Sequence, residues 1–214
     1  MAPKRARQAK QEMLRAFMEH TIAQAAKAVF AERGYQRATL EEIAQRAGMS
    51  KATIYLYYKN KDDLFLQVVE ELVDAATAVT AREAETTKPP LEKLYHMVYG
   101  KMAFYERERE FFRIYLNEKH GLEVAPKDPH KRTLRQMYLQ SIQHFERVLQ
   151  EGMRAGVLRS LESRRLAFFL QEMMSTVLVQ RIQGKAKTSV EEDVQQLLDL
   201  FLHGALQQSR DAAD

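Results

Sequence analysis

The chain has 214 residues and a net charge of +4, and nearly half of its residues are hydrophobic. This composition excludes a disordered protein, and the absence of cysteine excludes disulfides, thiol redox sensing and zinc–thiolate sites. No run of about 18 apolar residues and no signal-peptide core occur, so we expect a cytoplasmic protein without a membrane partner. Few Gly and Pro, with periodic Leu, Met, Ala, Glu and Gln, predict an all-α fold of about nine helices.

Positive charge is concentrated at the N-terminal end. Residues 1–61 hold 12 Lys or Arg and 5 Asp or Glu, a net charge of +7. Residues 62–214 hold 21 basic and 24 acidic residues, so this part is slightly negative. We therefore expect a polyanion to meet the N-terminal part.

The first 12 residues, MAPKRARQAKQE, are basic and almost without apolar side chains. They read either as a disordered, solubilising tail or as a basic arm that orders on DNA and adds phosphate or minor-groove contacts. A scaffold helix is predicted from about Met13 to Arg33, ending at Gly34. Its predicted buried face consists of Phe17, Ile22, Ala25, Ala26, Val29 and Phe30.

Residues 39–61 read as two short helices joined by a tight turn. Thr39 and Glu42 have the spacing of a capping box, and the apolar positions that follow recur at helical spacing. Gly48 suits the left-handed conformation at a helix end, and Ser50 caps the second helix, whose buried anchor is Ile54. A second helix with a basic and aromatic outer face is typical of a helix-turn-helix that reads DNA.

This stretch resembles the TetR/AcrR family of bacterial transcriptional regulators. The matching motifs are T-x-x-x-I-A-x-x-A-G-x-S (39–50) and T-I-Y-x-Y-Y-K-x-K-x-x-L (53–64), with Phe30 and Gly34 upstream. The resemblance covers residues 20–70, roughly a quarter of the chain, and departs from the family only at two aromatic positions, Tyr57 and Tyr58. It implies a three-helix DNA-binding domain over 1–61 with a basic N-terminal arm, and a helical bundle over 62–214 for effector binding and dimerisation.

The family positions also imply roles on DNA. Four residues are expected at base edges, where Lys51 suits guanine and Ala52 or Thr53 suits a thymine methyl group. With Tyr55, the base-reading set is Lys51, Ala52, Thr53 and Tyr55. The positions expected at phosphates are Thr39, Ser50, Tyr57 and Lys61. Tyr58 is expected to lie in the hydrophobic core and not to contact DNA.

A helix capped by Asn60 is predicted to run to about Glu85, and a new helix is predicted to begin near Pro90 or Leu91 after a polar break. Residues 91–155 are rich in Met and aromatic side chains, which suit either an ordinary core or an adaptable pocket between helices. Glu172 could select a cationic ligand. The candidate effector-pocket residues are Tyr95, Val98, Met102, Phe112, Tyr115, Met137, Tyr138, Phe145 and Met173.

The last two predicted helices span about 161–183 and 190–209, and Ser189 with Glu192 forms a second capping box. Both helices are apolar around much of their circumference, which indicates partners on two sides. Either they are buried within one chain, or they form a four-helix interface in a homodimer. The candidate interface residues are Phe169, Met174, Leu178, Leu198, Phe201 and Leu202.

These features predict a sequence-specific DNA-binding regulator, a repressor released from a palindromic operator by a small, largely hydrophobic effector. Two other interpretations stay open. One is a DNA-binding protein controlled by a protein partner without a small-molecule effector, and the other is a nonspecific, nucleoid-type DNA-binding protein. The six His are scattered without metal-ligand spacing, and no phosphate loop, G-x-S-x-G or H-E-x-x-H motif occurs. We therefore expect that the chain is not an enzyme and that it has no cofactor and no metal site.

Overall fold

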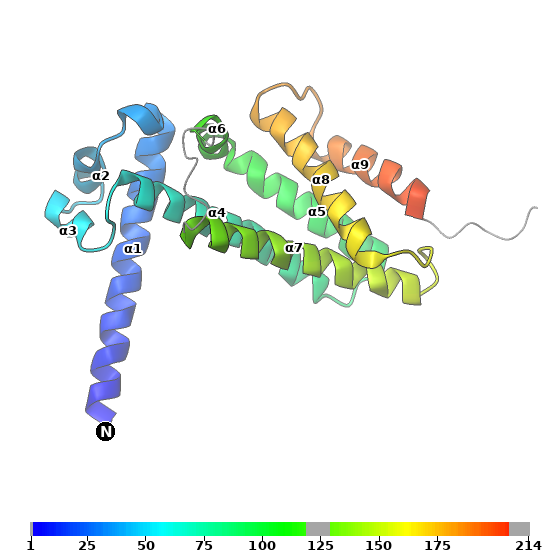
Figure 1. Ribbon diagram of the computed structural model, residues 1–214, viewed down its shortest axis with the longest axis horizontal. Helices are drawn as coiled ribbons and strands as arrows, with labels where there is room; N and C mark the ends of the chain where they lie inside the picture. Colours follow the sequence, from blue (N-terminus) through cyan, green and yellow to red (C-terminus); the bar gives the residue numbers. More distant parts are fainter. Residues whose placement is uncertain (1, 119–128, 206–214) are drawn as a thin grey trace, which may run out of the picture. The chain divides into compact units, whose positions relative to one another are not determined.

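The computed structural model describes residues 2–118 and 129–205, and every regular element in these ranges is a helix (Figure 1). There are nine helices in the described ranges, which confirms the predicted all-α fold and its expected number of helices. None of the helices described is both long and apolar enough to span a lipid bilayer.

The described residues form two compact units. The first contains residues 2–71 and 114–118, and the second contains residues 72–113 and 129–205. The division falls inside α4 (Lys61–Ala84), so this helix belongs to both units. The domain boundary predicted after residue 61 follows the DNA-binding motif and stays a prediction.

The first unit consists of α1 (Ala2–Arg37), α2 (Leu40–Arg46), α3 (Lys51–Tyr55), the start of α4 and the end of α6 (Arg109–Glu118). An aromatic cluster lies at its centre. The ring of Phe30 meets Phe65 edge-on with 5.0 Å between centroids, and Tyr35 lies 4.8 Å from Phe65. Gly34, with φ 74° and ψ 163°, ends the regular helix as predicted, since this conformation strains any side chain.

The start of α1 differs from the prediction. The helix begins at Ala2 rather than near Met13, so the tail or arm predicted over the first 12 residues is helical from residue 2 (Figure 1). Phe17 was predicted to be buried, but 65% of its surface is exposed because the core of the unit begins only at Ile22. Exposed side-chain pairs four residues apart, such as Arg15 with Glu19 at 2.8 Å, support the helix there.

The second unit packs α5 (Pro90–Arg107), α7 (Pro129–Arg154), α8 (Ser163–Ile182) and α9 (Val190–Ala205) together. The rest of α4 contacts α5 and α7. The predicted start of α5 at Pro90 is confirmed, and so is the Ser189–Glu192 capping box before α9. Most of the loop expected over 121–130 lies outside the described residues. The fully buried side chains at the centre of this bundle include Leu94, Met97, Val98, Met102, Ile142, Phe145, Leu149, Leu170, Met174 and Val194.

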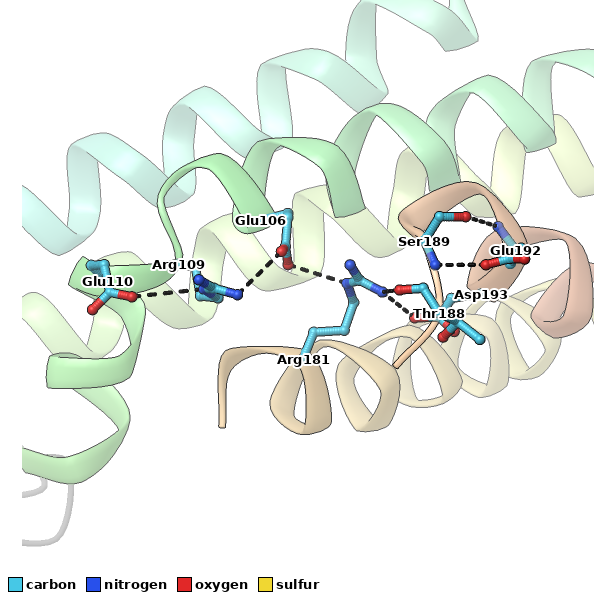
Figure 2. Close-up of polar contacts among 8 residues, drawn as sticks. All are labelled: Glu106, Arg109, Glu110, Arg181, Thr188, Ser189, Glu192 and Asp193. Carbon is cyan, nitrogen blue, oxygen red and sulfur yellow. Dashed lines mark hydrogen bonds and ion pairs between the residues drawn. The ribbon is translucent and has the colours of Figure 1, made fainter. Parts of the chain in front are cut away.

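A buried arginine joins three helices at one end of this bundle (Figure 2). From α8, Arg181 donates to the carboxylate of Glu106 on α5 at 3.1 Å and to Asp193 on α9 at 2.6 Å. It also donates to the backbone carbonyl of Thr188 at 2.9 Å. Because the guanidinium is only 8% exposed, these acceptors compensate for its lost hydration and fix the ends of α5, α8 and α9 relative to one another.

Candidate functional site

The helix-turn-helix begins with a fully formed cap. The hydroxyl of Thr39 accepts from the backbone N–H of Glu42 at 3.2 Å, and the Glu42 carboxylate accepts from the N–H of Thr39 at 3.1 Å. This confirms the predicted capping box. The turn follows at Gly48, whose φ of 69° is the left-handed conformation expected there. The predicted two-helix motif is therefore present, with α2 and α3 as its helices.

Local contacts also define α3. The hydroxyl of Ser50 accepts from the N–H of Thr53 at 3.1 Å, as predicted for its N-cap. Ile54 is fully buried and anchors the helix on its inner side. Lys51, Ala52 and Tyr55 are exposed on the outer side, where Tyr55 leaves 51% of its surface open. Three of the four predicted base-reading residues are thus accessible, and Thr53 is half-buried.

The exposed cation of α3 is held by its neighbours. The ammonium of Lys51 donates to the carboxylate of Glu41 on α2 and lies 5.9 Å from the centre of the Tyr55 ring. The hydrogen bond raises the pKa of Lys51 and lowers the pKa of Glu41. Both side chains are open to solvent, so water and salt screen this pair. An approaching polyanion could therefore take the place of the Glu41 carboxylate beside Lys51.

The predicted phosphate-contacting positions divide into two groups. Thr39 and Ser50 are exposed caps at the starts of α2 and α3, and Tyr57 is half-buried just after α3. Lys61 is different, because its ammonium donates to three backbone carbonyls at and just after the end of α1: Tyr35 at 2.9 Å, Ala38 at 3.1 Å and Gln36 at 3.2 Å. An ammonium has three N–H donors, so these bonds leave none for a phosphate.

Tyr58 lies in the core, where the sequence placed it. It is 5% exposed, and its hydroxyl donates to the carbonyl of Glu19 at 3.4 Å. Burial raises the pKa of the Tyr58 phenol. By contrast, the sequence reading missed Leu56, which follows α3 directly and is 79% exposed. If α3 reads DNA as predicted, an exposed apolar residue beside it is suited to contact a thymine methyl group.

The residues proposed for an effector pocket lie mainly in one cluster of the second unit. Val98, Met102 and Phe145 are fully buried in its core, with Tyr95, Tyr138 and Met173 packed against them. Met137 is half-buried and Phe112 is 4% exposed. The side chain of Tyr115 lies outside the described residues.

Glu172, the candidate for selecting a cation, already has a partner. Its carboxylate accepts from the Tyr138 hydroxyl at 2.7 Å. Burial, and then this hydrogen bond, raise the pKa of Tyr138 to about 12. The Tyr138 phenol therefore keeps its proton, and Glu172 keeps this hydrogen-bond donor, throughout the physiological pH range.

The candidate dimer residues fall on two sides of α8 and α9. Phe169 is 55% exposed and Leu202 is half-buried. The other four belong to the core of the second unit, which leaves little of their surface for another chain: Met174, Leu178, Leu198 and Phe201. The sequence reading missed Leu200, which is 71% exposed on α9.

Family comparisons match both units. A family model described as "Bacterial regulatory proteins, tetR family" matches residues 22–68. A second, described as "Tetracyclin repressor-like, C-terminal domain", matches residues 87–179. Together the two matches cover well over half of the chain and include α2, α3 and most of the helices that surround the buried cluster.

Relatives and solved structures agree with these matches. The chain is 32% identical over 91 residues to the HTH-type transcriptional regulator HbdR of Aromatoleum sp. (strain CIB). These aligned residues make up 42% of this chain and 40% of HbdR. The chain is 25% identical over 194 residues to the HTH-type transcriptional repressor KstR2 of Mycolicibacterium smegmatis, 89% of this chain and 91% of KstR2. A crystal structure of a transcriptional regulator from Saccharomonospora viridis in complex with choline has a TM-score of 0.76 at 23% identity, covering 90% of this chain and 100% of that one. The match to HbdR thus spans only about two fifths of the length of that protein. The likeness to the S. viridis protein concerns the fold.

Proposed function

The chain belongs to the TetR family of DNA-binding transcriptional regulators, and we propose that it acts as a repressor. In this proposal a cytoplasmic homodimer binds a near-palindromic operator and is released by a small, largely hydrophobic effector. It has no catalytic activity of its own. Repression is also the role of KstR2, a transcriptional repressor that matches nearly the whole chain.

The observation that carries the DNA-binding part is the outer face of α3. A capped helix presents Lys51, Ala52 and Tyr55 to solvent while Ile54 holds it from behind. A short helix of this kind fits the major groove, where Lys can donate to guanine and a small apolar side chain can meet a thymine methyl group. Thr39, Ser50 and Tyr57 lie close enough in sequence to take positioning contacts with the backbone.

The dimer part is supported by an apolar groove of about 710 Å³ on α8. Phe169, Leu161 and Met173 line it, and the Nε of Arg159, also in its lining, is buried without an acceptor among the described residues. A second copy would cover the apolar side chains. The same surface would then serve both chains, as a twofold interface requires.

Such a dimer would place two copies of α3 about one DNA turn apart, so the operator should be a near-palindrome. Effector binding in the second unit would shift α4, which continues into the first unit, and change the spacing of the two reading helices. Only an effector that binds the two spacings with different affinity can do this.

The test is selection of genomic fragments by the purified protein, followed by titration of the recovered site. We expect a near-palindromic site bound by a dimer, with binding lost in Tyr55→Ala and kept in Tyr58→Phe, whose side chain is buried. Weak, sequence-blind binding that is indifferent to Tyr55 would contradict the proposal. A reporter driven by the recovered promoter gives the sign: deletion of the gene should raise expression.

A regulator controlled by a protein partner, without a small effector, remains the alternative. It would bind the same operator. It differs in that no small molecule would shift its melting temperature or release its DNA.

A further inference from the structure

Two buried lysines on α5 differ in their partners. Lys93 is 8% exposed and pairs with the carboxylate of Glu151 at 2.8 Å, with the carbonyl of Ala84 as a second acceptor at 3.2 Å. Lys101 is 4% exposed and donates only to neutral oxygens: the hydroxyl of Ser141 at 2.6 Å and the side-chain carbonyl of Gln171 at 3.0 Å. The first lysine therefore has a counter-charge, and the second has none among the described residues.

The surroundings of Lys101 make this lack costly. Its ammonium lies 5.9 Å from the centre of the Phe145 ring, in a bundle whose neighbouring side chains, such as Ile142 and Met174, are fully buried and apolar. Burial lowers the pKa of Lys101 to about 7. A buried charge without a partner destabilises a fold, and an apolar residue of the same length would avoid that cost.

One donor of the Lys101 ammonium also remains open. Protonated lysine has three N–H donors, and two of them have acceptors within the described residues. A carboxylate that took the third would supply both the missing acceptor and the missing charge. Hydrogen bonds between two ionised groups are about twice as strong as neutral ones.

The polar groups around Lys101 continue to α4. On α7, three residues after Ser141, the imidazole of His144 lies 3.2 Å from the hydroxyl of Thr80, which is fully buried on α4. Next to Lys101 on α5, Gly100 lies so close to α4 that an added Cβ would be 2.6 Å from a methyl group of Val79. The part of the bundle around Lys101 therefore packs tightly against α4 and has a polar contact with it.

Resting on the regulator function proposed above, we propose that the effector is an amphipathic carboxylate whose acid group pairs with Lys101. Its apolar part would lie among the Met and aromatic side chains of the same cluster, such as Met102 and Phe145. Lys101 would repel a cationic ligand such as choline, and a neutral lipid would leave the ammonium without its counter-charge.

The test compares carboxylates with matched neutral molecules on the full-length protein. Octanoate, dodecanoate and palmitate are titrated beside octan-1-ol, dodecan-1-ol and hexadecan-1-ol, with choline as the cationic probe. We expect the wild type to bind a carboxylate at least about ten-fold more tightly than the alcohol of the same chain length, since a hydrogen-bonded charge pair contributes this much. Carboxylate affinity should fall as pH rises above 7, because the bound form needs the protonated lysine.

Two variants make the result specific to Lys101. In Lys101→Met the carboxylate and the alcohol should bind equally, whereas Lys93→Met, the second buried lysine of α5, should keep the preference. Equal binding of both classes by the wild type, a preference that survives Lys101→Met, preferred binding of choline, or no binding of any carboxylate would each overturn the inference.

Operator binding by the same preparations separates this inference from the proposed function. Wild type and Lys101→Met should bind the operator equally without ligand, and a carboxylate should release only the wild type. A protein that never binds an operator refutes the regulator proposal whatever its ligand preference. A protein that binds the operator but shows no Lys101-dependent carboxylate preference refutes only the effector assignment.

Discussion

The ammonium of Lys51, the first residue of α3, is paired with the carboxylate of Glu41 on α2. Both side chains are well exposed. The ion pair engages the ammonium of Lys51, which we expect to contact a guanine. Replacing the carboxylate in Glu41→Gln should release Lys51 and raise operator affinity by roughly two- to five-fold, since exposed ion pairs are weak. A fluorescence titration of operator DNA at fixed salt measures this change.

The control is Glu32→Gln. This carboxylate is similarly exposed and binds Arg46 on α2 at 2.5 Å, away from α3. The Glu32→Gln substitution removes the same charge from the same unit without releasing a side chain that is expected to contact a base. If both variants gained affinity equally on operator and random DNA, the effect would be general electrostatics and not the release of Lys51.

Lys61 should prove structural although the sequence suggested a phosphate contact. Its ammonium satisfies three carbonyls at and just after the end of α1, so Lys61→Met leaves them without this donor. We expect the free energy of unfolding to fall by about 1–3 kcal/mol, as measured by urea denaturation. Lys59→Met removes a nearby exposed charge and should weaken DNA binding without changing stability; the opposite pattern would restore the phosphate role to Lys61.

An acidic substitution should test the proposed dimer face. Phe169 is 55% exposed in the groove on α8, so Phe169→Asp should leave the chain folded but shift it to a monomer. The mass measured by light scattering would halve, and operator affinity would fall with it. Tyr99→Asp, which changes a 38% exposed aromatic residue on α5, is the control and should stay dimeric. A dimeric Phe169→Asp would place the interface elsewhere.

The features predicted correctly from the sequence depend on neighbours within a few residues. The caps at Thr39 and Ser189, and the turn glycine at Gly48, need only a partner three or four positions away. A short-range pattern specifies such a contact wherever the rest of the chain lies.

The features missed depend on distant partners. Lys101 meets Ser141 and Gln171, which lie 40 and 70 residues further along the chain, and nothing local marks it as buried except its place in the apolar stripe of α5. The helical start of α1 was missed for another reason: basic and polar residues form a solvated helix as readily as a tail, and hydrophobic periodicity detects only buried faces.

Arg181 should be the most important polar residue for the stability of the second unit. Arg181→Met would leave Glu106 and Asp193 without their shared cation, at a cost of about 3–5 kcal/mol in the free energy of unfolding. Arg165→Met removes an exposed arginine of the same helix that lies 3.6 Å from Glu162, and it should have little effect. Thermal denaturation of the two variants beside the wild type decides this, and similar melting temperatures would show that the buried cluster is not needed for stability.

The buried ammonium of Lys101 should give stability a distinct pH dependence. In the unfolded chain Lys101 keeps its proton up to its ordinary pKa of 10.5, whereas burial lowers the pKa to about 7 in the folded protein. Unfolding between these pH values takes up a proton, so the free energy of unfolding should rise with pH, by up to about 1.4 kcal/mol per pH unit. Below pH 7 the lysine is protonated in both states, and its contribution is constant and least favourable.

Urea denaturation across pH 6 to 10 measures this rise, and two variants assign it. Lys101→Met should be more stable than the wild type at pH 6 and should lack the part of the slope above pH 7, whereas Lys93→Met should retain that part because Lys101 is still present. The imidazole of His144, which interacts electrostatically with Lys101, does not interfere, since burial lowers its pKa from 6.5, below the range of the slope. An unchanged slope in Lys101→Met would mean that the lysine stays protonated in the folded protein, held by Ser141 and Gln171 alone.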